Sequence, residues 1–495
     1  MHKISQINAP KLHLISLGCS KNLVDSEVML GRLQCCSLTD NISEADVIII
    51  NTCGFIQSAK QESIRTILEA SNMRKNGAIL VVSGCLSERY AKELEEEIKE
   101  IDIIIGVRDY ATIDSLLTQK GIVLPNFVPT KTKNNAISAP KPLDSSTRNN
   151  ADKGSTDSSS LNSIGYRNHP QNLASNQKVF LANEHHKRII TGSRIHAYIK
   201  LSEGCNQQCS FCSIPSFKGK LQSRSIQSIL NEVESLAKEG FMDFSFIAQD
   251  SSSYLQDFGQ KDGLVALIKA LDAQAIARNA RIHYLYPTST SEKLIEAIAA
   301  SNIIQNYFDI PIQHIADSML ARMRRNIRKK RLKELLSLMR QTPNAFLRST
   351  LIVGHPGESQ EEFDELYEFV EEGIFDRLNL FAFSSEEGTL AHTMAEKIQT
   401  KTINARLNAL NKILRTQDKH RYQTLKNTTL EVLLEGKSSI SEYFYSARDK
   451  RWGLEIDGEI LINESDIEYP KAGLYEAYIS EYKYGLLFGK LTRAL

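Results

Sequence analysis

The stretch EGCNQQCSFC, residues 203–212, places Cys205, Cys209 and Cys212 at the spacing C-x3-C-x2-C. It directly follows an apolar, strand-like run over 196–201, and a regular alternation of strand and helix patterns begins there. We expect further strands over 243–247, 281–286, 307–310, 346–353 and 377–383. Six such βα units over about 230 residues predict a (β/α) barrel, partial or complete, with the three cysteines in a loop at the catalytic end of its first strand.

Three cysteines at this spacing suit an iron–sulfur cluster. Three thiolates hold three irons of a four-iron cluster and leave the fourth iron open to a small ligand. A structural zinc site is the alternative, but it requires four closed ligands, and no second cysteine pair lies nearby in the sequence.

The residues before this barrel contain a second cysteine pattern. Strand-like runs over 11–17, 45–51, 78–83 and 101–105 alternate with helical patterns and are apolar on both faces, which predicts an open parallel sheet. Cys19, Cys53 and Cys85 each follow one of these strands by one to three residues, at the sheet edge where ligands bind. Neighbouring strands lie about 4.8 Å apart, so these thiols can meet at one cluster. Three buried structural cysteines are the alternative, and Cys35 and Cys36 receive no role.

Composition changes twice more along the chain. Five of the twelve prolines lie between Pro125 and Pro170, among many Ser and Asn residues, so we predict a disordered linker. After a closing helix over 401–425, short strands over 429–434, 442–447, 452–457, 475–480 and 485–491 predict a small β-barrel. The expected domains are 1–125, the linker 126–188, the barrel domain 189–425 and the C-terminal domain 426–495.

Charge and hydropathy exclude several protein classes. The 60 basic and 59 acidic residues nearly cancel, which argues against a surface that binds polyanions throughout. No apolar run reaches the length of about 18 residues that spans a membrane, and the first 18 residues lack a secretory signal. Eight cysteines are too few for a disulfide-stabilised secreted protein. We therefore expect a cytoplasmic protein without a membrane partner.

The C-x3-C-x2-C spacing, with Phe211 before its last cysteine, resembles that of the radical S-adenosylmethionine (SAM) enzymes. The resemblance implies that the open iron of this cluster binds SAM and cleaves it to a 5′-deoxyadenosyl radical, which abstracts a hydrogen from the substrate. It also implies that Phe211, Gln249, Gly354 and Gly357 lie near SAM. No catalytic residue beyond the cluster ligands is expected.

The three domains together resemble the radical SAM methylthiotransferases, whose C-terminal barrel is called TRAM. The resemblance covers the whole chain except the linker and is strongest for the branch that modifies a ribosomal protein. It rests on residues 16–27, 51–56, 248–250, 284–287 and 309–314. Ser20 and His355 depart from the usual Pro and Phe. The expected fold class is thus α/β: an open parallel sheet domain, a partial radical-SAM barrel and a TRAM-like β-barrel.

The resemblance implies a reaction and its partners. Two 4Fe-4S clusters, on Cys19, Cys53 and Cys85 and on Cys205, Cys209 and Cys212, would act with SAM to methylthiolate the β-carbon of an aspartate of small ribosomal subunit protein twelve. A low-potential donor, flavodoxin or ferredoxin, is implied as well.

Two other functions stay open. One is the same chemistry on an adenosine of tRNA, in which case tRNA is the partner. Residues 426–495 carry nine basic and twelve acidic residues, a net charge of −3 that favours a basic protein over RNA. A local basic face of Arg448, Lys450 and Arg451 is the alternative. The other is an iron–sulfur scaffold or regulator without enzymatic activity, which would need no open iron.

Several charged residues near the expected site allow two interpretations. Lys218, Lys220 and Arg224 follow the triplet and either meet a carboxylate of SAM or substrate, or are simply solvated. Glu386 and Glu387 follow the sixth barrel strand and are either polar pocket residues or part of a solvated loop.

Overall fold

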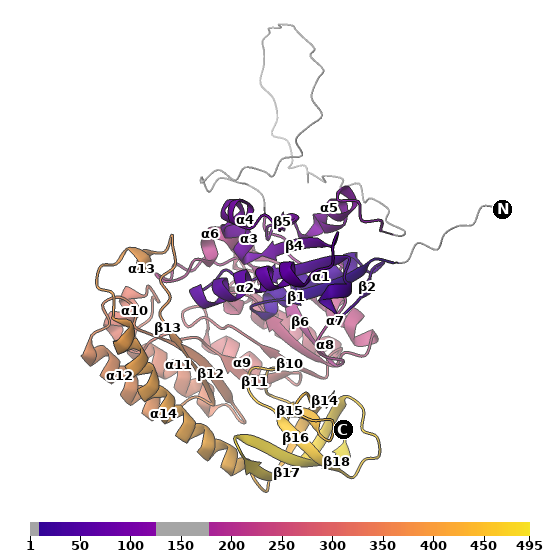
Figure 1. The fold of residues 1–495 in the computed structure, drawn as a ribbon. Coiled ribbons are helices and arrows are strands. Elements are labelled where there is room, and N and C mark those ends of the chain that lie inside the picture. The colour runs from indigo at the N-terminus through magenta and orange to yellow at the C-terminus, as the bar shows by residue number, and fades with distance from the viewer. Residues whose placement is uncertain (1–8, 125–177) are drawn as a thin grey trace, which may run out of the picture. The chain divides into compact units, whose positions relative to one another are not determined.

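The structure, a computed structural model, describes residues 9–124 and 178–495, which belong to one compact unit (Figure 1). Most of the predicted linker, residues 126–177, lies outside the described residues. Within the described part, the strands form a five-stranded sheet, a six-stranded sheet, a closed five-stranded barrel and a two-stranded hairpin. No helix of this part is long and apolar enough to span a membrane.

The first sheet is parallel and has the order β2-β1-β3-β4-β5. Its central strands are almost wholly apolar and buried, as expected of a parallel sheet that helices cover on both faces. The strands are β1 (Lys11–Ser16), β2 (Ser37–Leu38), β3 (Val47–Thr52), β4 (Ile79–Gly84) and β5 (Ile103–Ile105). The helices are α1 (Ser20–Arg32), α2 (Gln57–Met73), α3 (Cys85–Arg89), α4 (Ala91–Glu97) and α5 (Ile113–Gln119), with 3-10 turns at Ile42–Glu44 and Tyr110–Thr112.

The second sheet is also parallel, and its strands follow one another in sequence order from β6 at one edge to β13 at the other. Six parallel strands in this order form the partial (β/α) barrel that the sequence predicts. The strands are β6 (His196–Lys200), β9 (Asp243–Ile247), β10 (Asn279–Ile282), β11 (Ile304–Asp309), β12 (Phe346–Val353) and β13 (Arg377–Ala382). A hairpin of β7 (Ser202–Glu203) and β8 (Gln222–Ser223) flanks the cysteine loop.

Most helices of this part bury their apolar faces against the sheet in one large core. The helices of this part are α6 (Ile214–Lys218), α7 (Ile226–Lys238), α8 (Gly263–Gln274), α9 (Glu292–Ala300), α10 (Asp317–Arg322), α11 (Lys329–Gln341), α12 (Gln360–Glu371), α13 (Leu390–Thr393) and α14 (Thr400–Leu425), with 3-10 turns at Ser251–Ser253 and Gln256–Phe258. Helix α12 begins with a capping box, in which Ser359 and Glu362 satisfy each other's backbone N–H groups.

The last strands, drawn in yellow, close into a barrel in the order β14-β15-β16-β18-β17 (Figure 1). They are β14 (Thr429–Lys437), β15 (Tyr445–Asp449), β16 (Ile460–Ser465), β17 (Gly473–Lys483) and β18 (Leu486–Ala494). The strand predicted over 452–457 is wrong, because the Asp457 carboxylate accepts the Gly453 N–H at 2.7 Å and closes a turn there. Trp452, whose apolar side chain suggested a strand here, packs instead into the core of this barrel from the turn.

The predicted linker extends too far at its end, because residues 178–188 are packed. Val179 and Ala182 are buried. The Phe180 N–H donates to the Val107 carbonyl, and Arg188 forms ion pairs with Glu27 of α1 and Glu232 of α7. This segment therefore joins the first sheet domain to the barrel. Its short length and few apolar residues hid that role in the sequence.

Candidate functional site

The first cysteine set lies at one edge of the first sheet. Strands β1, β3 and β4 are neighbours, and their register aligns Ser16 with Asn51 and Asn51 with Ser83. Cys19, Cys53 and Cys85 follow these aligned residues by two or three positions. The strand order reverses between β1 and β3, which is the switch point where open α/β sheets bind ligands.

Two asparagines join the loops that carry these cysteines. The Asn22 amide donates to the carbonyls of Leu17 (3.1 Å) and Thr52 (3.0 Å), and the Asn51 amide donates to the Asn22 carbonyl (2.8 Å). The Asn22 amide oxygen lies 3.7 Å from the Cys85 thiol. This network holds the three thiols in place without a disulfide.

The second cysteine set lies in the loop between β7 and α6, after the first barrel strand. The Cys205 N–H donates to the Gly219 carbonyl (3.1 Å), and the Ser210 backbone donates to Met323 and accepts from Ala391. The Arg325 guanidinium lies 3.1 Å from the Cys209 sulfur. The loop is thus fixed from both sides of the barrel mouth.

Both cysteine sets line a single cavity of about 510 Å³. Its wall contains Cys19, Cys53 and Cys85 from the first sheet domain and Cys205, Cys209 and Cys212 from the barrel domain. In the part of the chain that the structure describes, no three Cys, His, Asp or Glu side chains gather closely enough for a single metal ion. A four-iron cluster is larger than one ion and takes one thiolate on each ligated iron, so thiols spread over a cavity wall suit it better.

The chemistry of the lining fits clusters and a polar ligand. Burial raises the pKa of Cys53 to about 11 and that of Cys85 to about 12, so these thiols ionise when a positive centre takes the proton's place. Burial likewise raises the pKa values of Cys205 and Cys212 to about 12. Gln249 and Gln313 line the cavity, and their side-chain oxygens are buried and accept no hydrogen bond. Such unpaired acceptors suit a ligand that donates hydrogen bonds, such as an amino group.

A buried network of charges lies beside the cavity and connects the two domains. The Lys200 ammonium contacts Asp25 of α1 at 2.6 Å and Glu203 at 2.5 Å. Lys218 lies 3.5 Å from Glu203 and 3.8 Å from Asp25, and the Gln249 amide donates to Glu203 (2.7 Å). The solvated interpretation of Lys218 is therefore wrong: it is buried, and its charge is neutralised inside the protein.

Of the other four charged residues considered from the sequence, two are buried in ion pairs and two are exposed. Glu386 is buried and forms ion pairs with Lys60 of α2 (2.9 Å) and Arg89 of α3 (3.2 Å), so it also joins the two domains. Arg224 is buried and paired with Glu232. Lys220 and Glu387 are exposed. None of these four lines the cavity.

Comparison with known proteins assigns the family. The chain is 53% identical over 483 residues to the ribosomal protein uS12 methylthiotransferase RimO of Wolinella succinogenes, covering 98% of each chain. It is also 53% identical to the RimO of Helicobacter hepaticus, covering 97% of each chain. The chain belongs to the RimO family.

Family models agree with this membership, and a solved structure shares the fold. Residues 11–106 match the model described as "Uncharacterized protein family UPF0004", and residues 199–370 match the radical SAM superfamily. A radical SAM methyltransferase, TsrM from Kitasatospora setae, solved with cobalamin and a [4Fe-4S] cluster, is similar in fold. Its TM-score is 0.50 at 13% identity, and the match covers 76% of this chain and 72% of that one. This RimO-family chain is thus a radical SAM enzyme.

The four residues expected near SAM fall into two groups. Phe211 and Gln249 line the cavity, whereas Gly354 and Gly357 do not. Both glycines have positive φ, and a side chain at Gly354 would collide with Ile403 of α14. At Gly357 it would collide with Glu396. Backbone conformation and packing therefore suffice to explain these glycines, and their place near SAM stays a prediction.

Several cavity residues of this RimO-family chain were not identified from the sequence. They are Lys21, Tyr284, Tyr286, Gln313 and Arg325. Four of these five lie in the stretches that carry the family resemblance, but their side-chain directions depend on the fold. Tyr284 and Gln313 also have positive φ, at 62° and 74°. A non-glycine residue in that region is strained, and such residues cluster at functional sites.

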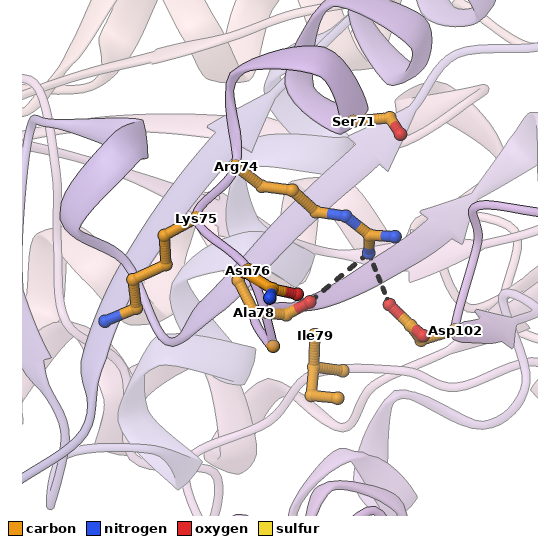
Figure 2. A pocket seen from close by; sticks show the side chains of 8 residues that line it. Ser71, Arg74, Lys75, Asn76, Ala78, Ile79 and Asp102 are labelled. Atoms are coloured by element: carbon orange, nitrogen blue, oxygen red, sulfur yellow. Dashed lines mark hydrogen bonds and ion pairs between the residues drawn. The ribbon is translucent and has the colours of Figure 1, made fainter.

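A smaller cavity of about 420 Å³ lies at the opposite end of β4, beside Arg74, Lys75 and Asp102 (Figure 2). Figure 2 shows the Arg74 guanidinium bonded to the Asp102 carboxylate (2.5 Å) and the Ala78 carbonyl (3.3 Å). Lys75 is paired with Asp46. The charged side chains that line this smaller cavity are thus paired within the protein, and none of the eight cysteines lines the cavity.

The atypical His355 gives a pH-dependent prediction. It is buried, accepts from the Ser210 hydroxyl and donates to the Pro356 carbonyl, each at 3.0 Å. Burial lowers its pKa to about 4 from an ordinary value of about 6.5. As the pH falls from about 6.5 to about 4, the unfolded chain therefore binds a proton that the folded chain does not, and stability is lost by up to about 1.4 kcal/mol per pH unit.

His355→Phe is expected to remove this loss. Between pH 7.5 and 5.5, the free energy of unfolding should fall by about 1 kcal/mol more in the wild type than in the variant, as measured by urea denaturation. His185→Gln is the control, because the His185 side chain is 82% exposed. Equal pH dependence of wild type and His355→Phe would show that His355 does not titrate in this range.

Proposed function

We propose that this chain attaches a methylthio group to the β-carbon of an aspartate of ribosomal protein uS12, with SAM and two 4Fe-4S clusters as cofactors. One observation carries the proposal: cysteine sets from two different domains face one cavity of about 510 Å³. The proposal assigns Cys19, Cys53 and Cys85 to one cluster, and Cys205, Cys209 and Cys212 to the cluster that binds SAM. Bound there, these groups supply the inserted sulfur, its methyl group and the one-electron chemistry that activates a C–H bond.

The chain itself positions the reactants and excludes water. Phe55 and Ile56 from the first sheet domain and Phe211 and Phe381 from the barrel domain give the cavity an apolar wall. Apolar walls protect a reactive species from solvent and hold reacting atoms in contact. The ion pairs of Glu386 with Lys60 and Arg89 hold the two domains together beside it. Gln249 and Gln313 provide acceptors for SAM or substrate.

The C-terminal barrel supports a basic protein over RNA as the partner. The three cations of the alternative basic face are all paired: Arg448 with Asp243 and Glu435, Lys450 with Glu431, and Arg451 with Asp449. They leave the net charge of −3 over 426–495 without a local basic patch of their own. RNA binding requires cations that are free to meet phosphates.

The proposal also covers location and electron supply. An acceptor on the ribosome places the reaction in the cytoplasm, and the one-electron chemistry requires a low-potential donor, for which flavodoxin or ferredoxin is suitable.

Mass spectrometry of a strain that lacks this chain tests the substrate. We expect uS12 lighter by one methylthio group and unchanged tRNA. Loss of a methylthio group from tRNA with unchanged uS12 would contradict the proposal and favour the adenosine alternative.

A further inference from the structure

Lys21 places a positive charge at the cavity wall without a negative partner. It lies in the first turn of α1, two residues after Cys19, and no acidic residue lies in that turn. Its ammonium is 3.6 Å from the centre of the Tyr284 ring and 3.4 Å from the Ala248 carbonyl. Among the residues that the structure describes, no carboxylate lies within 4.0 Å of this nitrogen. An ammonium has three hydrogens to donate, so most of its capacity is left for a ligand.

The other two cations of the cavity are already engaged. Lys218 has the carboxylates of Glu203 and Asp25. Arg325 donates to the Pro311 carbonyl at 2.6 Å and contacts the Cys209 sulfur and the Tyr286 ring. Arg325 therefore belongs to the second cysteine set, whereas Lys21 belongs to the first. A negatively charged group near the first set would find Lys21 as its available partner.

The position of Lys21 depends on a strained residue. Tyr284 has a φ of 62°, held by its N–H, which donates to Asp309 (3.3 Å), and by its carbonyl, which accepts from the Ser251 N–H (3.0 Å). This conformation sets the Tyr284 ring beside the Lys21 ammonium. A cation–π contact restrains the ammonium and leaves its remaining hydrogens available to a ligand. Strain that serves such an arrangement is typical of binding sites.

We propose that the Lys21 ammonium binds the side-chain carboxylate of the acceptor aspartate, and that the Tyr284 ring is the positioning group that holds it. The inference rests on the proposed function and deepens it. In aspartate the carboxylate carbon is bonded directly to the β-carbon, so fixing the carboxylate also fixes the reacting carbon. Because Lys21 adjoins Cys19, it would hold that carbon beside the first cysteine set, to which the sulfur is assigned.

The test measures binding of purified uS12 to the reconstituted enzyme, with the acceptor as Asp or replaced by Asn. A hydrogen bond between charged groups corresponds to a change of about tenfold to a hundredfold in Kd. We expect Lys21→Met to weaken binding of the Asp form by at least about tenfold and that of the Asn form little. Lys21→Arg should restore most of the binding. The matched control is Lys220→Met, which removes an exposed lysine outside the cavity.

Two further variants test the tyrosine. Tyr284→Phe keeps the ring and should bind the Asp form like the wild type, whereas Tyr284→Leu should weaken it in the same way as Lys21→Met. Iron content should stay at the wild-type value in every variant that keeps the folded structure, and SAM cleavage without uS12 is measured in each variant as a separate readout. The Asp-to-Asn comparison isolates the carboxylate, because general damage to the site lowers binding of both forms equally.

Each other outcome overturns the inference in its own way. Equal weakening of the Asp and Asn forms, or none, would show that Lys21 does not contact this carboxylate. A raised SAM requirement for cleavage would mean that Lys21 binds the carboxylate of SAM, and lost iron would mean that it supports a cluster. If the wild type modifies uS12 in these cases, the proposed function stands. If the wild type modifies only tRNA, the proposed function fails, and the assignment of Lys21 fails with it.

Discussion

Replacing Cys205, Cys209 and Cys212 together with alanine is expected to abolish SAM cleavage and to lower bound iron from about eight to about four atoms per chain. These three thiols lie in one loop at the barrel mouth and share the cavity with the first set. Alanine cannot ligate iron, so the cluster assigned to SAM would be lost. The other set, at the edge of a separate sheet, should keep its own iron. Iron analysis and measurement of 5′-deoxyadenosine under strong reductant give both results.

The matched control uses cysteines that lie elsewhere. Cys35 and Cys36 are half-buried in the turn after α1 and do not line the cavity. Their replacement by alanine should leave the iron content and SAM cleavage at wild-type values. A triple variant of the second set that kept all of its iron would show that these three cysteines hold no cluster.

Replacing Cys19, Cys53 and Cys85 with alanine should have the opposite pattern. Bound iron should again fall to about four atoms, but SAM cleavage under strong reductant should persist, because the barrel loop and its three thiols are untouched. Methylthiolation of uS12 should disappear completely. Cys53 and Cys85 are buried, so the purified variant must first be shown to retain its folded barrel domain by its circular dichroism and thermal unfolding.

This pattern separates the two cysteine sets by role. Loss of SAM cleavage in a normally folded Cys19/Cys53/Cys85 variant would contradict the division of labour between them. Retained methylthiolation would contradict the assignment of the sulfur to the first set.

Much of the fold follows from sequence patterns with a simple physical cause. Buried parallel strands such as Val47–Thr52 are apolar on both faces, and the alternation with helices determines a parallel sheet. The cysteine placement follows equally, because residues just after neighbouring parallel strands meet at one edge. The strand predicted over 452–457 failed because Trp452 and Ile456 gave an apolar pattern while Asp457 and Gly453 formed a turn.

Other features of the site depend on contacts between residues far apart in the sequence. Lys218 resembled a solvated loop lysine, but Asp25, almost two hundred residues earlier, neutralises it within the protein. Beside Gly354, Ile403 of α14 fills the space that a side chain would take, a contact that no local pattern predicts. The cation–π contact of Lys21 with Tyr284 depends on a left-handed backbone that a tyrosine seldom adopts, so no local pattern predicts it.

The most direct test of the proposed function is a single competition assay. The reconstituted enzyme is incubated with SAM, reductant and equal amounts of purified uS12 and total tRNA, and both products are analysed by mass spectrometry. We predict that uS12 gains the mass of one methylthio group on an aspartate and that tRNA is unchanged. A methylthio group on an adenosine of tRNA, with none on uS12, would contradict the account.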